Sequence, residues 1–227
     1  MPKPVSASGS LRVLAALLSY PDAGMRRHLA EMRAILSSEA AVSATRRAEL
    51  EALIDALDGG DPLQVEADYV ELFDRGRGTS LHLFEHVHGD SRERGPAMID
   101  LAQTYEKAGL LLAPGELPDY LPVVVEFTST QPPREARAFL DEMAHILNAL
   151  FNALQQRRSG YASVVGALLD LAGSKAQAVK VAAEQALDES WEEPPVFAGC
   201  SAQGQSSPGQ PQAIHLVRKN PQTGAVA

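Results

Sequence analysis

Apolar residues recur every three to four positions through most of the first 190 residues, and this spacing constrains the fold more than any other feature of the chain. In the first such stretch they are Leu11, Leu14, Leu17 and Leu18. No window alternates apolar and polar residues convincingly over more than four positions, as a half-buried strand would. The pattern therefore predicts an all-α protein, a single helical domain of about eight to nine helices.

Capping and breaking residues predict where these helices begin and end. Asp22 and Ser43 are expected to cap the second and third helices, and Asp61 followed by Pro62 to begin the fourth. Gly109 suits the left-handed position that follows a helix. Further helices are expected at residues 94–108, 118–130, 134–158, 161–171 and 175–187.

The composition changes from residue 192 onward, where Pro, Gly, Ser and Gln accumulate. Such a segment buries too little apolar surface to offset the entropy lost on ordering its backbone. We therefore expect a helical domain over residues 1–197 and a disordered tail over residues 198–227.

Charge and cysteine content exclude several classes of protein. The formal net charge of −9 argues against nucleic-acid binding and against binding to anionic membranes. Cys200 is the sole cysteine, so an internal disulfide is excluded. No run of 18 apolar residues occurs, so we expect no direct membrane insertion and a cytoplasmic location.

A polar stretch at residues 74–95 interrupts the helical pattern. Its 22 residues include four Arg, three His and four Gly. Long loops of this kind inside a compact chain are more often functional than ornamental.

Within this stretch, His82, Glu85 and His86 match the H-x-x-E-H pattern of inverted zinc peptidases. On a helix the two histidines would lie on one face, and Glu85 would activate a zinc-bound water. Glycines bracket the motif closely, and no third ligand is marked. We assign no catalytic residue and no metal ligand and expect ordinary hydrogen-bonding histidines, with a zinc-dependent hydrolase as an alternative function.

The arginines of the stretch allow two interpretations. Guanidinium groups beside glycine backbone N–H groups suit a phosphate or pyrophosphate. The other interpretation, which we favour, is pairing with nearby carboxylates, namely those of Asp74, Glu85, Asp90 and Glu93. The candidate anion contacts are Arg75, Arg77, Arg92 and Arg94.

Aromatic and acidic residues gather around the same stretch. Aromatic residues at helical spacing are usually core residues, which favours burial of much of Tyr69 and Phe73. Phe84 lies in polar sequence and suits an anchor for an amphipathic peptide. Glu116, Asp119 and Glu126 are expected to form an acidic rim around such a groove.

Three segments resemble a known family: YVELFDRGR at residues 69–77, SLHLFEHVHGDSR at residues 80–92 and ELPDYLP at residues 116–122. The chain is similar, over roughly residues 10–197, to the assembly chaperones of respiratory nitrate reductase, the delta-subunit type of molybdoenzyme maturation chaperone. The resemblance implies a chaperone rather than an enzyme. It implies binding to the N-terminal segment of the apo catalytic (alpha) subunit and support of molybdenum cofactor insertion before membrane docking.

The resemblance also implies that no cofactor is bound permanently, with a transient contact to molybdopterin guanine dinucleotide. In the wider group, the stretch matching Pro118–Tyr120 is associated with signal-peptide recognition, although those relatives commonly have His at the position of Tyr120. A helical adaptor for an unrelated amphipathic helix is the remaining alternative. The expected peptide-binding residues are Tyr69, Phe73, Leu83, Phe84, His88, Pro118, Asp119, Tyr120 and Glu126.

Overall fold

The computed structural model describes residues 7–89 and 91–174, and within them the chain is all-α, as predicted. Eleven α-helices and one short 3-10 helix occur in these residues, without any strand. The helices are α1 (Ser8–Leu18), α2 (Ala23–Arg26), α3 (Leu29–Glu39), α4 (Ala44–Gly59), α5 (Pro62–Phe73), α6 (Leu83–Val87), α7 (Arg94–Lys107), α8 (Leu121–Thr130), α9 (Pro133–Glu142), α10 (Ala144–Gln156) and α11 (Ala162–Ala172), and the 3-10 helix η1 is Arg77–Thr79.

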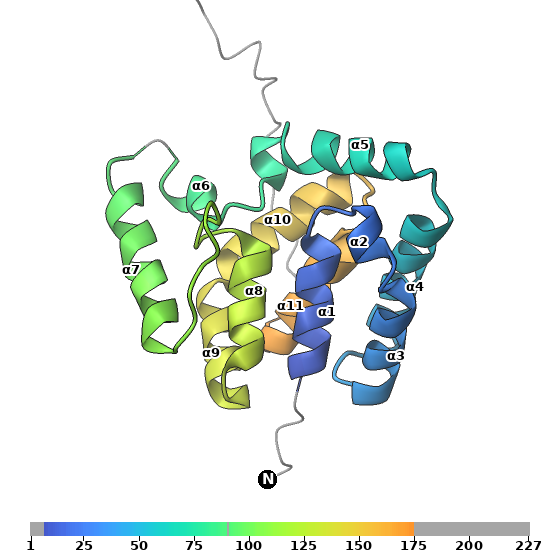
Figure 1. The fold of residues 1–227 in the computed structure, drawn as a ribbon, viewed down its shortest axis with the longest axis horizontal. Helices are drawn as coiled ribbons and strands as arrows, with labels where there is room; N and C mark the ends of the chain where they lie inside the picture. The colour runs from blue at the N-terminus through green and yellow to red at the C-terminus, as the bar shows by residue number, and fades with distance from the viewer. Residues whose placement is uncertain (1–6, 90, 175–227) are drawn as a thin grey trace, which may run out of the picture. The chain divides into compact units, whose positions relative to one another are not determined.

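The core forms where α1, α8, α10 and α11 meet. Helix α1 packs along α8, while α11 packs against α10, α9 and α4 (Figure 1). Val164, Val165 and Leu168 of α11 are fully buried, as expected for a helix that is apolar around most of its circumference. Among the described helices, none is both long and apolar enough to cross a membrane.

The predicted capping residues are confirmed, although the helix expected at residues 118–130 begins only at Leu121. Asp22, Ser43 and Asp61 each accept a hydrogen bond from the backbone N–H three residues further on. Each cap thereby satisfies a donor that the first turn of a helix leaves without an intrahelical partner. Gly109 has a φ of +82°, so its place after α7 suits glycine.

The number of helices exceeds the prediction of eight to nine because two expected helices are divided and because α6 forms within the polar stretch, where no helix was expected. The expected helix at residues 134–158 breaks at Met143, so that α9 packs on α8 and α11 while α10 follows a separate course. Neither Pro nor Gly marks this break. The helix expected after Asp22 is likewise divided into α2 and α3 at Arg27 and His28. The expected helix at residues 175–187, the boundary at residue 197 and the tail lie outside the described residues.

Residues 74–120, which connect α5 to α8, place the polar stretch against the start of α8. An isolated antiparallel bridge joins His82 to Tyr120. In it, the Leu83 N–H donates to the Asp119 carbonyl at 3.0 Å, and the Leu121 N–H donates to the Leu81 carbonyl at 2.8 Å. The bridge brings together two of the three segments that carry the family resemblance.

Candidate functional site

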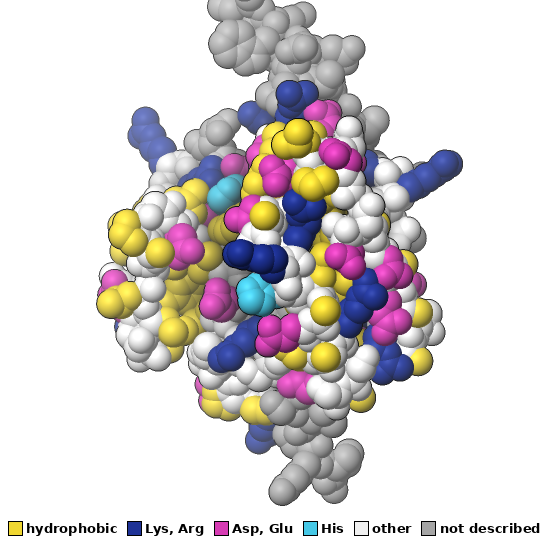
Figure 2. All heavy atoms as spheres, turned by 45° about the vertical axis from the view of Figure 1, so that its right-hand side comes forward, with side chains coloured by type: hydrophobic (Ala, Val, Ile, Leu, Met, Phe, Trp, Pro, Cys, Tyr) yellow, Lys and Arg dark blue, Asp and Glu magenta, His cyan; other side chains and the backbone are white. Residues whose placement is uncertain are grey.

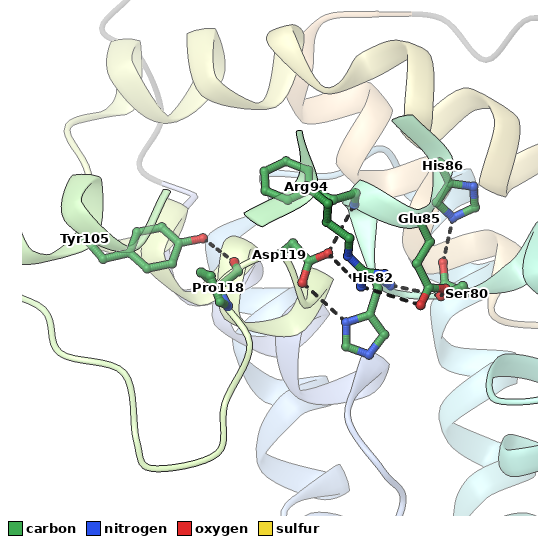
Figure 3. A network of polar contacts seen from close by, with 9 residues as sticks. Ser80, His82, Glu85, His86, Arg94, Tyr105, Pro118 and Asp119 are labelled. Carbon is green, nitrogen blue, oxygen red and sulfur yellow. Dashed lines mark hydrogen bonds and ion pairs between the residues drawn. The ribbon is translucent and has the colours of Figure 1, made fainter. Parts of the chain in front are cut away.

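A buried carboxylate lies at the centre of the polar stretch (Figure 3). The side chain of Asp119 is fully buried. One carboxylate oxygen accepts the backbone N–H of Phe84 at 3.2 Å and lies 3.8 Å from the Arg94 guanidinium. The other lies 3.4 Å from Nδ1 of His82. The prediction that Asp119 is a rim residue is therefore wrong, because its oxygens are engaged beneath the surface.

A second carboxylate extends this network. Glu85 lies 3.6 Å from Arg94 and accepts the Ser80 hydroxyl at 2.5 Å. The Ser80 carbonyl in turn lies 2.8 Å from Nε2 of His86. Arg94, at the start of α7, thus lies between two carboxylates, and the network links α6, α7 and the start of α8 (Figure 3).

His82 is the titratable member of the network. Its hydrogen bond with Asp119 raises the imidazole pKa, and the nearby charges of Asp119 and Glu85 act in the same direction. Partial burial and the charge of Arg94 oppose this rise. The net direction of the pKa of His82 is upward.

The histidines do not form the helical pair that a zinc site of the inverted type requires. His82 precedes α6 in extended conformation, so His82 and His86 do not share a helical face. Their rings contact different partners, Asp119 and the Ser80 carbonyl. No group of three or more potential metal-ligating side chains occurs in residues 7–89 and 91–174. The interpretation of this motif as a helical ligand pair is therefore wrong.

The four arginines have different surroundings. The predicted pairing of Arg94 with Glu85 is confirmed, whereas Arg75 pairs with Glu71 at 2.8 Å rather than with a carboxylate of the loop. Arg77 and Arg92 have exposed side chains. The Arg94 side chain is less exposed than those of Arg77 and Arg92, because it lies against Glu85 and Asp119.

Two of the aromatic residues expected in a peptide groove are core residues. Tyr69 and Phe73 are each only 4% exposed, and neither lines the groove that lies beside Tyr120. The Tyr69 hydroxyl donates to the Leu18 carbonyl at 2.7 Å and lies 3.0 Å from the Tyr120 hydroxyl. Burial raises the pKa of Tyr69. Tyr69 therefore supports Tyr120 from beneath.

A groove does lie beside Tyr120, between α1 and α8. Its volume is about 300 Å³, and Tyr120 is half-buried at its wall. Glu116 and Glu126 are exposed at its edge. Burial raises the pKa of Tyr120, so its hydroxyl stays protonated near neutral pH. The groove is lined by Arg12, Ala15, Ala16, Ser19, Glu116, Tyr120, Pro122, Val123 and Glu126.

The other expected site residues lie on the α6 side of the bridge or beneath it. Phe84 is half-buried against the core, and its ring meets that of His88 edge-on at 5.4 Å. Leu83 and Pro118 are buried, and the Pro118 carbonyl accepts the Tyr105 hydroxyl at 2.7 Å. Of the nine expected peptide-binding residues, only Tyr120 and Glu126 line the α1–α8 groove.

Sequence reasoning missed the wall that α1 contributes. Arg12 and Ser19 lie on the outer side of a helix whose other positions are mostly buried Leu, Val and Ala. Their polarity within a Leu-rich helix was the available signal. It identifies an outward face but does not reveal that α8 lies beside it.

Comparison with known proteins identifies the family to which this chain belongs. The family model described as nitrate reductase delta subunit matches residues 39–165, which include the His82–Tyr120 bridge. The chain belongs to the nitrate reductase delta subunit family. Among its relatives, the nitrate reductase molybdenum cofactor assembly chaperone NarJ of Escherichia coli K12 is 43% identical over 193 residues, covering 81% of this chain and 82% of the relative.

Two further comparisons concern one relative and one solved structure. The nitrate reductase-like protein NarX of Mycobacterium tuberculosis H37Rv is 37% identical over 153 residues, covering 67% of this chain but only 22% of NarX. A crystal structure from Archaeoglobus fulgidus, described as a redox enzyme maturation protein, has a TM-score of 0.51 and 20% identity. It covers 74% of this chain and 94% of its own, and it shows that the fold is shared.

Proposed function

We propose that this delta subunit family member is a cytoplasmic chaperone for the maturation of a respiratory nitrate reductase. It binds the apo catalytic (alpha) subunit, keeps it competent for molybdenum cofactor insertion, and delays membrane docking until insertion is complete. It is not an enzyme and not part of the finished reductase. The observation that carries the proposal is the 43% identity to a nitrate reductase molybdenum cofactor assembly chaperone over most of both chains.

The N-terminal segment of the catalytic subunit binds, in this proposal, in the α1–α8 groove. Tyr120 provides an aromatic wall, and Pro122 and Val123 provide apolar contacts. The exposed carboxylates of Glu116 and Glu126 favour a segment with basic residues beside its apolar stripe. Phe84 and His88 form a second contact surface on the α6 side of the bridge.

The buried members of the predicted set act indirectly. Tyr69 positions the Tyr120 ring through the contact between their hydroxyls. Asp119 fixes the backbone at Phe84 and so the course of the loop beside Tyr120. Leu83, Phe73 and Pro118 pack beneath these residues and supply the shape of the surface rather than contacts to the partner.

Contact with the cofactor, in this proposal, is transient. Arg77 and Arg92 are exposed arginines of the polar stretch, and guanidinium groups suit the pyrophosphate of molybdopterin guanine dinucleotide. Arg75 contributes once it leaves Glu71, since both side chains of that pair are largely exposed. Exposed pairs of this kind are weak, about 0–1 kcal/mol, and exchange readily for another anion.

The test is the molybdenum content of the reductase purified from cells with and without this chain. The proposal predicts that reductase made without the chain is largely free of molybdenum, and that expression of the intact chain restores the metal. An exposed-surface control, Glu106→Lys on α7, should restore it equally well. Full molybdenum content in cells that lack the chain would contradict the proposal.

A further inference from the structure

A second hollow lies between α4 and α5, away from the α1–α8 groove. Its volume is about 350 Å³, and residues 159–161 contribute to its lining. The two helices follow each other in sequence, yet they diverge, with α5 crossing the end of α4 (Figure 1). The lining residues are Glu49, Ala52, Leu53, Ala56, Leu57, Val65, Asp68, Tyr69, Leu72, Ser159, Gly160 and Tyr161.

The lining follows helical spacing on both walls. On α4 the residues fall at positions 49, 52, 53, 56 and 57, and on α5 at positions 65, 68, 69 and 72. Each wall is therefore the continuous face of about two helical turns, or roughly 12 Å along the axis. Side chains at this spacing are those that contact a partner in helix-in-groove recognition.

The walls of the hollow are apolar where a side chain would enter. Leu53 and Leu57 form its floor, while Ala52 and Ala56 are exposed and small enough to admit a close neighbour. Tyr161 also lines the hollow, and its buried hydroxyl has no hydrogen-bond partner among the described residues. Figure 2 brings the side of the molecule that carries α4 toward the viewer, and apolar side chains are visible there between charged ones.

The carboxylates at the edge of the hollow favour a partner that carries basic side chains. Residues 61–74 include five carboxylates, of which Glu71 pairs with Arg75 at 2.8 Å. Asp68, which lines the hollow, is exposed and accepts the side-chain amide of Gln64 at 2.7 Å. Glu49, on the facing wall, pairs with Arg46 at 2.5 Å. Among the described residues, Asp68 is therefore the carboxylate of the hollow that has no cationic partner.

We propose that the α4–α5 hollow is a docking site for an amphipathic helix of a partner protein, with aliphatic side chains inserted between Leu53 and Val65 and a Lys or Arg against Asp68. The site shares no lining residue with the α1–α8 groove. It does not depend on the proposed function, because its evidence is the apolar hollow and the charge of α5. It gives the chain two separate surfaces for contact with other proteins.

The experiment uses the full chain with labelled methyl groups and a synthetic amphipathic helix of Leu and Lys as the probe. We expect the probe to shift the NMR signals of Leu53, Leu57 and Val65. Ala56→Phe fills the hollow and should weaken this binding about tenfold or more, while Ala30→Phe, an equally exposed alanine on α3, should leave it unchanged. A Leu–Glu helix of the same pattern should bind far more weakly.

Asp68→Lys provides a second variant that leaves the hollow open and reverses its edge charge. Circular dichroism establishes whether each variant is folded. If Ala56→Phe does not fold, binding of the probe to Asp68→Lys is the test of the proposal. Shifts confined to Val123 and its neighbours would mean that the probe binds only the α1–α8 groove. Shifts that depend on protein concentration without the probe would mean that a second copy covers the hollow. Either result, or equal binding of the Leu–Glu helix, would overturn the proposal.

Discussion

The helical core and the polar segment at residues 74–120 are stabilised in different ways. In the core, α1, α8, α10 and α11 bury Leu, Val and Ala side chains over long helical faces. In the polar segment, a few directional contacts decide the structure, among them the bonds of Asp119 and the Tyr105 hydroxyl. Apolar burial is spread over many side chains and is not directional. A buried carboxylate, in contrast, costs free energy whenever one of its hydrogen-bond or charge partners is lost.

The difference teaches where this chain is sensitive to single substitutions. A core substitution should lower the stability of the whole domain, since the buried side chains form one cluster. A substitution in the polar segment should release the loop and α7 while the core stays folded, since α7 is connected to the remainder chiefly through Tyr105 and Arg94. The predictions that follow test this separation.

The largest effect is expected for Leu147→Ala on α10. Leu147 is fully buried, so its truncation leaves a cavity and should cost about 2–5 kcal/mol of unfolding free energy. Denaturant unfolding followed by circular dichroism measures the loss. Leu111→Ala is the matched control, because Leu111 is 83% exposed and should change stability by less than about 0.5 kcal/mol. Equal effects of the two substitutions would contradict this account of the core.

Asp119→Ala should have the next largest effect, about 1–3 kcal/mol, confined to the polar segment. It leaves the Phe84 N–H without its carboxylate acceptor and removes one of the two carboxylates beside Arg94. Hydrogen exchange should accelerate at Phe84 and through α7 while α11 stays protected. Asp119→Asn keeps an acceptor oxygen and should lose less. Unchanged protection at Phe84 would show that the carboxylate does not fix the loop.

Tyr105→Phe should cost about 1 kcal/mol, because it removes the hydrogen bond to the Pro118 carbonyl but keeps the buried ring against Phe127. Exchange of the α7 amides should rise more than exchange in the core. Tyr20→Phe is the control, since the Tyr20 hydroxyl bonds Glu66 at an exposed position and should matter less. A larger effect at Tyr20 than at Tyr105 would contradict the role given to this contact.

His82→Gln should have the smallest effect, and one that depends on pH. Because Asp119 raises the pKa of His82 in the folded protein, the stability that His82 contributes is fully present below its unfolded pKa, about 6.5. That contribution is lost as the pH rises through the folded value. Unfolding experiments between pH 5.5 and 8.5 should therefore show a larger loss for His82→Gln at the acid end. A loss of stability that grows toward alkaline pH would contradict the raised pKa of His82 in the folded protein.

The core could be predicted from the sequence because its information is local and repeated. Leu11, Leu14, Leu17 and Leu18 mark the inner face of α1 through their spacing alone, and Asp22 and Ser43 mark helix starts through short-range hydrogen bonds. The break at Met143 has no such signal in the sequence; both α9 and α10 pack on α11, but α9 also packs on α8, whereas α10 also packs on η1 and α6.

The segments of the candidate site could be predicted from the sequence, but their arrangement could not. The polar character of residues 74–95 and the motif at residues 116–122 predicted two segments that the structure joins at the bridge between His82 and Tyr120. That Asp119 is buried depends on the bridge between His82 and Tyr120, which are 38 positions apart, so local spacing could not reveal it. The wall of the groove on α1 depends on an even more distant pairing, between α1 and α8.

The most direct test of the central claim is calorimetric titration of the chain with a synthetic peptide of the N-terminal segment of the cognate catalytic subunit. The account predicts binding by the parent chain and a loss of about tenfold or more for Val123→Trp, which fills the α1–α8 groove. Glu126→Lys should weaken binding mainly at low salt, while Glu106→Lys on α7 should bind as the parent does. Binding of equal strength to the parent, Val123→Trp and Glu126→Lys would contradict the placement of the partner in this groove.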